Sequence, residues 1–155
     1  MTQNRSPDPI EKMFSALDLD SSGTVSSDYF IKFLKDNGLR LETDPRLASV
    51  YRELSQMGAL TQDYKLSLYE FSKLVSSAIS LLYRCVEGKL RVPDWQSFEA
   101  IFKEIFEIVE ENTSGNNADY IPQLAAVNPD QFGISVTTVD GQQLSIGDTD
   151  VQFCI

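Results

Sequence analysis

The sequence predicts a mainly α fold that ends in a β-hairpin. Before residue 113, apolar residues recur at the period of an amphipathic helix in successive stretches. A polar run at residues 112–117 then interrupts this pattern, as a linker would. Beyond it, residues 133–139 alternate in polarity and are rich in β-branched side chains, and Asp140-Gly141 separates them from residues 142–146. A strand, Asp-Gly and a second strand form the strongest short-range signal for a hairpin.

The helical stretches are expected to bury one face each. They cover residues 10–17, 30–34, 44–54, 67–82 and 94–109. Their starts carry helix-initiating residues: Asp8-Pro9, Asp44-Pro45, Ser67 with Glu70, and Asp94. Gly38 is a normal residue to follow the end of the second stretch. The apolar stripes are interpreted as core, because a period near 3.6 is typical of helices that pack on one side.

Composition excludes several kinds of site. The 155 residues carry a net charge of −10 and contain no histidine. The acidic balance argues against a nucleic-acid partner, which needs clustered Lys and Arg. Without histidine, this stretch holds no Ser-His-Asp triad, Cys-His pair or histidine-zinc site. Cys85 and Cys154 are expected to be buried thiols, because two cysteines do not make a disulfide framework.

Targeting and charge distribution give further expectations. No apolar run approaches the ~20 residues that cross a bilayer, so no membrane partner is expected. The first residues lack the basic and apolar regions of a signal peptide, which indicates an intracellular chain or a targeting segment already removed. No Lys or Arg follows Lys103, whereas acidic residues continue beyond it. Basic partners on further chain would compensate such an acidic tail.

Residues 18–29 fit the front of a calcium-binding loop. The ligand positions are filled by Asp18 (first), Asp20 (third), Ser22 (fifth), the Thr24 carbonyl (seventh) and Ser26, which could hold a water (ninth). Gly23 stands at the sixth position, where the loop turns sharply, and Val25 fills the apolar eighth position. With a helical stretch on each side, this segment resembles an EF-hand.

The twelfth position departs from the EF-hand pattern. A bidentate glutamate is required there, and this chain has Tyr29. Asp28 does not replace it, because a shift of one residue on a helix turns a side chain by roughly 100°. Two interpretations therefore stay open: a calcium loop with an affinity of ~10⁻⁴ M or poorer, or a hand kept for its helix-loop-helix geometry without a metal.

A second, degenerate hand is expected at residues 59–70. Leu66 holds its eighth position and Glu70 its twelfth, but Ala59 and Tyr64 stand at the first and sixth. This loop should not bind calcium. Paired with the first loop, it is typical of a structural EF-hand pair rather than of a tuned sensor.

Motifs near the end of the chain resemble a known enzyme family. They are Asp119-Tyr-Ile-Pro-Gln-Leu-Ala125, Phe132-Gly133, Thr138-Val-Asp-Gly-Gln142, Ser145-Ile-Gly-Asp148 and Val151-Gln-Phe-Cys154. In this order and spacing they resemble the start of the catalytic domain of serine-dependent glutaminases. Asp44-Pro-Arg-Leu47 and Val92-Pro-Asp-Trp-Gln-Ser-Phe98 are similar to the helical N-terminal region of the animal enzymes. The expected domains are thus 1–111, EF-hand-like; 112–118, linker; and 119–155, the N-terminal part of the catalytic domain.

This resemblance implies a fold and an activity. The hairpin would begin an α+β, β-lactamase-like domain that hydrolyses glutamine to glutamate and ammonia through a Ser-x-x-Lys motif. That motif would start about two residues after Ile155, so no catalytic residue is expected in this chain, which should be inactive alone. Tyr120 is expected to line the glutamine pocket; a ring that caps the first strand is its alternative role. The resemblance also implies a phosphate-activated, self-associating, mitochondrial enzyme with no required cofactor.

The sequence also has to be compared with two functions of other classes. One is a free-standing EF-hand adaptor that binds an amphipathic partner helix in its groove. The hairpin and the Tyr-Ile-Pro-Gln-Leu block favour the regulatory and assembly region of a glutaminase, because an adaptor has no use for them. A complete small hydrolase is excluded, since the chain has neither the nucleophile nor the base.

Overall fold

The computed structural model describes residues 8–152, and Cys154 lies outside them. The chain divides into two compact units. The helical unit runs up to Pro93 and also includes Thr138–Gln142; the second unit comprises Asp94–Thr137 and the residues from Gln143 onward. The predicted domains ended the helical part at residue 111 instead. The two divisions differ because Phe106 stacks on Phe132, with 5.1 Å between ring centroids, which groups the last long helix with the hairpin.

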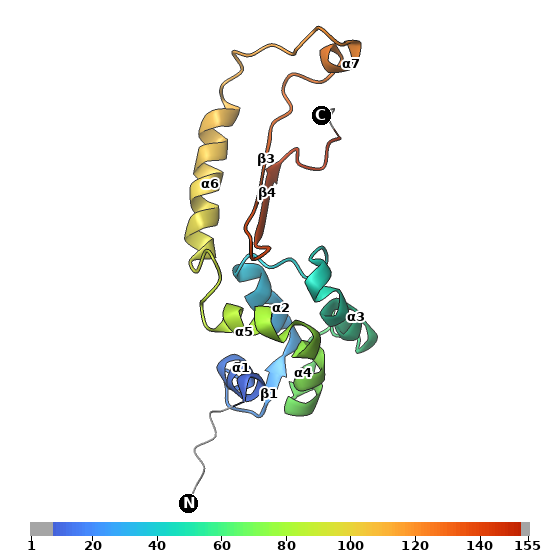
Figure 1. Cartoon of the computed structure of the whole chain (residues 1–155), viewed down its shortest axis with the longest axis vertical. Helices are drawn as coiled ribbons and strands as arrows, with labels where there is room; N and C mark the ends of the chain where they lie inside the picture. The colour runs from blue at the N-terminus through green and yellow to red at the C-terminus, as the bar shows by residue number, and fades with distance from the viewer. Residues whose placement is uncertain (1–7, 153–155) are drawn as a thin grey trace, which may run out of the picture. The chain divides into compact units, whose positions relative to one another are not determined.

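The helical unit is built from two helix-loop-helix segments (Figure 1). The first comprises α1 (Pro9–Leu17), β1 (Thr24–Ser26) and α2 (Ser27–Asp36). The second comprises a 3₁₀ turn (Pro45–Leu47), α3 (Ala48–Gln56), β2 (Lys65–Ser67) and α4 (Leu68–Val75). A second 3₁₀ turn (Ser76–Ala78) and α5 (Ile79–Val86) follow.

The start of α1 and the end of α2 lie where their sequence signals indicate. Pro9 is the first residue of α1, and the Asp8 side chain accepts a hydrogen bond from the Ile10 amide. After α2, Gly38 adopts a φ of 75°, and the Leu39 amide donates to the Leu34 carbonyl at 2.9 Å. This bond satisfies a carbonyl at the helix end that has no partner within the helix.

One predicted helix is divided in the structure. The stretch expected to run continuously over residues 67–82 is broken by the 3₁₀ turn Ser76–Ala78. The Ser76 hydroxyl donates to the Lys73 carbonyl at 2.7 Å, a local bond of the kind that competes with a regular helix. Because of this break, α4 and α5 have different directions, and each buries its own apolar face in the same core.

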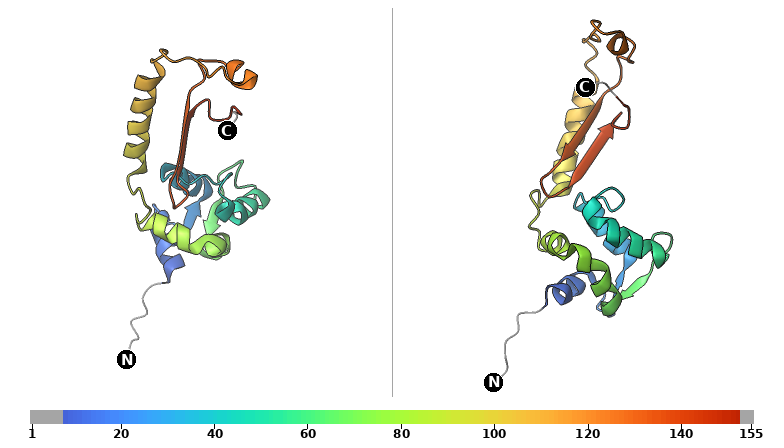
Figure 2. Two further views of the ribbon diagram at one scale, coloured as in Figure 1. Left: turned by 45° about the horizontal axis from the view of Figure 1, so that its top comes forward. Right: turned by 45° about the vertical axis from the view of Figure 1, so that its right-hand side comes forward.

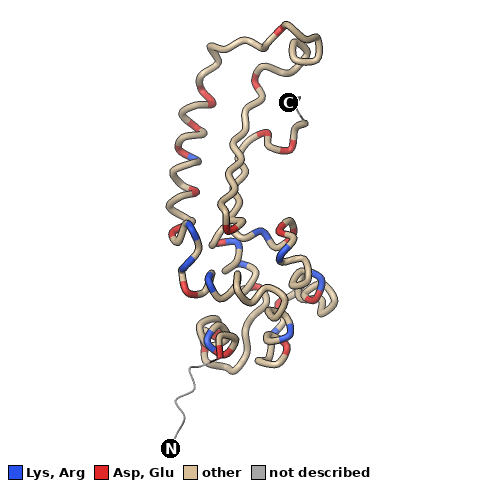
Figure 3. Tube along the Cα trace, viewed as in Figure 1, with Lys and Arg blue, Asp and Glu red and all other residues tan. Residues whose placement is uncertain are grey.

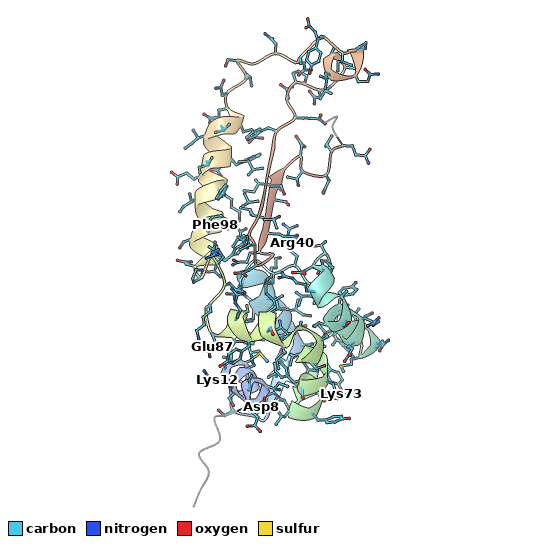
Figure 4. All side chains as sticks on the ribbon, viewed as in Figure 1. Asp8, Lys12, Arg40, Lys73, Glu87 and Phe98 are labelled. Carbon is cyan, nitrogen blue, oxygen red and sulfur yellow. The ribbon has the colours of Figure 1, made fainter. Side chains whose placement is uncertain are left out.

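The core of the helical unit is continuous across both segments. Phe71 contacts Phe14 and Phe30 edge to face, with ring centroids 5.5 and 5.8 Å apart. At the periphery, Lys12 on α1 forms an ion pair with Glu87 just after α5, at 2.6 Å (Figure 4). Cys85 is buried in this core, as predicted, and burial raises the pKa of its thiol to about 12. It is therefore a packing residue without a reactive thiolate.

The second unit joins one long helix to the hairpin. It contains α6 (Trp95–Glu110), the short α7 (Pro122–Ala125), β3 (Gly133–Thr137) and β4 (Gln143–Gly147). The strands pair antiparallel with Ser135 opposite Ser145, as the sequence around Asp140-Gly141 predicts, and Figure 2 shows the two strands side by side. Figure 3 shows that acidic residues continue along α6 after Lys103. Within residues 8–152, no helix combines the length and apolar character needed to cross a membrane.

Candidate functional site

The first loop folds around its own acidic side chains. The two carboxylate oxygens of Asp18 accept hydrogen bonds from the Ser22 and Gly23 amides, at 3.0 and 2.9 Å. Asp20 also accepts from the Ser22 amide, at 3.2 Å. Gly23 has a φ of 80°, as the sharp turn at the sixth position requires. Hydrogen bonds from Ser22 lower the pKa of Asp20, so this carboxylate stays ionised.

Two residues in the second half of the loop, Ser26 and Tyr29, make contacts within the fold. Ser26 is the N-cap residue of α2, and its hydroxyl oxygen accepts from the Tyr29 amide at 3.2 Å. The same hydroxyl donates to Asp63 of the second loop at 2.5 Å. Tyr29, in place of the bidentate glutamate, packs against the hydrophobic core. Among residues 8–152, no group of three or more His, Cys, Asp or Glu side chains could hold a metal ion. The residues present therefore fit a calcium ion poorly.

The two loops are joined by a short sheet. Val25 in β1 stands opposite Leu66 in β2, and both side chains are fully buried. These are the apolar eighth positions of the two loops. The sequence assigned both residues to the eighth positions, and the structure shows that they are paired across the two hands.

The second loop is closed by its own side chains. Glu70 accepts hydrogen bonds from the Ser67 hydroxyl at 2.6 Å and from the Tyr64 hydroxyl at 2.7 Å. It also accepts from the Ser67 amide, which completes the capping box of α4. Bonds from Ser67, and then from Tyr64, lower the pKa of Glu70. The carboxylate that a calcium loop would use at its twelfth position is here a helix cap.

Ser27 links the loops through the interior, and sequence reasoning missed it. Its buried hydroxyl donates to the Ala59 carbonyl at 3.2 Å and accepts from the Tyr64 amide at 2.9 Å. The Ser27 amide donates to the Tyr64 carbonyl at 2.9 Å. No local pattern marks this serine, because it follows the N-cap residue like any polar residue in the first turn of a helix.

Tyr120 lies in the second unit, just before α7. Its side chain is 78% exposed, so the ring does not pack as a cap on the first strand. A hollow of about 400 Å³ in the same unit is lined by residues around the strands, including Phe132, Ser135 and Asp148, but not by Tyr120. The structure therefore brings together the loop residues of the first hand, and Tyr120 belongs to the second unit.

Two models of known protein families match different parts of this chain. Residues 10–93 match the family model described as EF-hand domain, and they end where the first continuous segment of the helical unit ends. The chain belongs to the EF-hand domain family. Residues 115–155 of this EF-hand chain match a second model, described as Glutaminase. The resemblance predicted from the motifs is thereby confirmed for both parts.

Two of the relatives of this EF-hand chain match over most of its length, and a third matches a smaller part. The chain is 32% identical to putative glutaminase 3 of Caenorhabditis elegans over 94% of its own length and 26% of that protein. It is 40% identical to the mitochondrial liver-isoform glutaminase of Mus musculus, over 81% of its length and 21% of that protein. A glutaminase of Bacteroides thetaiotaomicron is 53% identical over 55 residues, which are 36% of this chain and 17% of that protein. The chain thus spans about a quarter or less of these relatives.

Proposed function

We propose that this chain is the N-terminal regulatory and assembly region of a glutaminase, which converts L-glutamine and water to L-glutamate and ammonia. The EF-hand pair forms a scaffold, and the hairpin belongs to the catalytic domain. The chain itself supplies no nucleophile or base for this reaction. Activity is therefore expected only in a longer protein that adds the Ser-x-x-Lys motif.

One observation carries this proposal. The similarity to the C. elegans relative extends over 94% of the chain, and therefore over both the EF-hand unit and the hairpin unit. An EF-hand domain alone is used in many unrelated proteins, so it says little about function. Similarity that includes the residues matching the glutaminase model is more informative, because it ties the helical unit to this enzyme family.

The test is an amide-hydrolysis assay on a longer protein that contains this sequence. Release of ammonia and glutamate from glutamine is expected, with little release from asparagine. The 155-residue chain serves as the matched control and should release none. A correctly folded longer protein that leaves glutamine intact would contradict the proposal.

Tyr120 is proposed to line the glutamine pocket of the longer protein. Its exposure in the described chain supports this role, because an exposed ring is available for a ligand or for further chain. In the longer protein, Tyr120→Phe should raise KM for glutamine if the hydroxyl group contacts substrate. An unchanged KM would remove Tyr120 from the pocket.

Calcium is proposed to have at most a weak role. The loop offers two carboxylates, and the residues at its ninth and twelfth positions make other contacts. Any affinity is expected at ~10⁻⁴ M or poorer, and no cofactor is required. A mitochondrial location is proposed because the mouse relative is named as mitochondrial; a fluorescent fusion of the longer protein would test it.

Self-association is proposed as well. Ile101, Ile105 and Ile108 on α6 are exposed and share a helix face by their spacing. The neighbouring Glu104 and Glu107 would repel their counterparts in a second copy, so association should strengthen as salt screens these charges. Sedimentation velocity of the longer protein at low and high salt tests this. A monomer under both conditions would contradict it.

The adaptor hypothesis is less well supported. A free-standing adaptor should fold without the hairpin, yet Thr138–Gln142 contributes to the helical unit. A segment that would be dispensable in an adaptor is thus part of that unit's own structure. The glutaminase proposal explains why the hairpin and the EF-hand pair occur in one chain.

A further inference from the structure

The turn between β3 and β4 is built into the helical unit. Its residues Thr138–Gln142 group with that unit, whereas the strands on either side group with the second unit. Asp140 and Gln142 are 6% and 0% exposed, although both are polar. Polar side chains at the tip of a hairpin are normally solvated, so their burial needs partners that replace water.

Asp140 finds those partners in arginines of the helical unit. Its carboxylate oxygens accept hydrogen bonds from the Arg84 guanidinium at 2.9 and 3.1 Å, in a bidentate arrangement. The Arg91 amide donates to the same carboxylate at 2.6 Å, and the Arg46 guanidinium donates to the Asp140 carbonyl. A paired arginine matches a carboxylate in both geometry and charge. The tip is therefore held at its side chain and at its backbone.

The Gln142 side chain forms hydrogen bonds with backbone groups that lie outside the β-strands. Its Oε1 accepts from the Val92 amide at 3.1 Å, and its Nε2 donates to the Val92 carbonyl at 2.8 Å. The same Nε2 donates to the Asn37 carbonyl at 3.0 Å. Both amide hydrogens and the carbonyl oxygen are thus used. A leucine or alanine here would leave three backbone groups of the half-buried residues Val92 and Asn37 without these bonds.

Gly141 leaves room for the Arg46 guanidinium because it has no side chain. Its φ is 81°, and a Cβ atom there would lie 2.0 Å from Nη2 of Arg46. The contacts of this turn therefore require all three residues, Asp-Gly-Gln. A residue that tolerates a positive φ would not be enough. A solvent-exposed turn would need only such a residue.

We infer that Asp140, Gly141 and Gln142 form a latch that holds the turn of the hairpin in the EF-hand unit and thereby stabilises the pairing of β3 with β4. A hairpin of two strands is marginal alone, and fixing its tip restricts the conformations of both strands. Because the strands belong to the glutaminase-like part, the latch is the route by which the helical region acts on the proposed catalytic domain. This role for the latch rests on the proposed function. Asp140 and Gln142 are positioning residues, since neither is placed at a substrate.

The latch can be tested in the 155-residue chain without any catalytic assay. Gln142→Met keeps the size of the side chain and removes its amide; Asp140→Asn keeps the shape and removes the charge. Gln142→Met should accelerate hydrogen exchange of the Val92 amide by about tenfold, because the acceptor of that amide is lost. Asp140→Asn should accelerate exchange of the Arg91 amide, whose acceptor loses its charge. Both substitutions should also accelerate exchange in residues 133–137 and 143–147. Val139→Thr is the matched control, since Val139 lies in the same turn and is 81% exposed. Circular dichroism verifies that helix content is unchanged.

The outcomes separate the latch from the proposed function. Faster exchange at Val92 and in both strands supports the inference; faster exchange at Val92 with unchanged strands overturns it. In a longer protein that hydrolyses glutamine, Gln142→Met should change kcat/KM by about fivefold or more, the range typical of coupled sites, with Val139→Thr unaffected. Unchanged kinetics in an active enzyme would overturn the coupling role. A longer protein with no glutaminase activity would refute the proposed function, while the exchange result would still stand.

Discussion

Asp63 in the second loop accepts a hydrogen bond from the Ser26 hydroxyl of the first loop, with 2.5 Å between the two oxygens. Asp63 also accepts from the Asp28 amide at 3.3 Å, at the start of α2. The Ser26 hydroxyl is therefore both donor and acceptor within the protein, and one lone pair of its oxygen remains for a water. The hydrogen bond from Ser26 is also the main cause that lowers the pKa of Asp63. A carboxylate of the degenerate loop thus stabilises the pairing of the two hands.

Calcium binding to the 155-residue chain is expected to be weak. Half-saturation should require ~10⁻⁴ M calcium or more, because the bidentate glutamate of the twelfth position is absent. Isothermal calorimetry measures this, and Asp18→Ala should abolish whatever heat is seen. Tyr29→Glu restores the missing bidentate ligand and should tighten binding by about tenfold. Micromolar affinity in the unaltered chain would show that the loop rearranges to ligate the ion.

Ser27→Ala should destabilise the helical unit by about 1–3 kcal/mol. The substitution leaves the Ala59 carbonyl and the Tyr64 amide without their buried partner. Urea denaturation followed by circular dichroism measures the free energy of unfolding. Ser15→Ala is the matched control: this serine is exposed on α1, and its replacement should change stability by less than about 0.5 kcal/mol. Equal effects of the two substitutions would argue against the internal link.

Gly141→Ala should destabilise more than Gly58→Ala. Both glycines have a positive φ, 81° and 72°, so both substitutions add backbone strain of about 1 kcal/mol. A Cβ at Gly58 meets nothing within 4 Å, whereas one at Gly141 displaces the Arg46 guanidinium. The difference in unfolding free energy between the two variants isolates the cost of opening the latch. Identical values would mean that the tip moves away from Arg46 without cost.

Acid should weaken the latch. Burial alone raises the pKa of Asp140, but the bonds from Arg84 and from the Arg91 amide outweigh burial, so the pKa lies below its ordinary value. A depressed folded-state pKa gives stability that is present above the ordinary value of about 3.9 and lost as pH falls below it. Unfolding free energy measured between about pH 6 and pH 3 should therefore decline toward acid.

Asp140→Asn provides the control for this pH dependence. The variant cannot ionise at this position, so its decline toward acid should be shallower than that of the unaltered chain. Other carboxylates with lowered pKa values, such as Asp44 and Glu70, retain their share of the decline in both proteins. Parallel curves for the two proteins would mean that the charge of Asp140 contributes nothing to stability.

The sequence by itself determined the local structure. Apolar periodicity and Pro9 placed α1, the loop pattern placed Val25 and Leu66 at the apolar eighth positions, and Asp140-Gly141 placed the hairpin turn. These features depend on residues close in the chain, whose spacing and backbone preferences are visible in the sequence. The break at Ser76–Ala78 was missed because the apolar stripe continues through it.

Only the tertiary structure decided which distant residues meet. The sequence Asp140-Gly141-Gln142 is typical of an ordinary exposed turn. Nothing in it indicates that the turn is buried against Arg84 and Val92. The sequence pattern assigns Ser26 to the ninth loop position, but it does not indicate that its hydroxyl donates to Asp63 of the other loop. Such contacts depend on surfaces that come together after the local elements form. The sequence thus gives an EF-hand pair and a glutaminase-like hairpin, whereas the folded chain shows that the helical unit holds the turn of that hairpin.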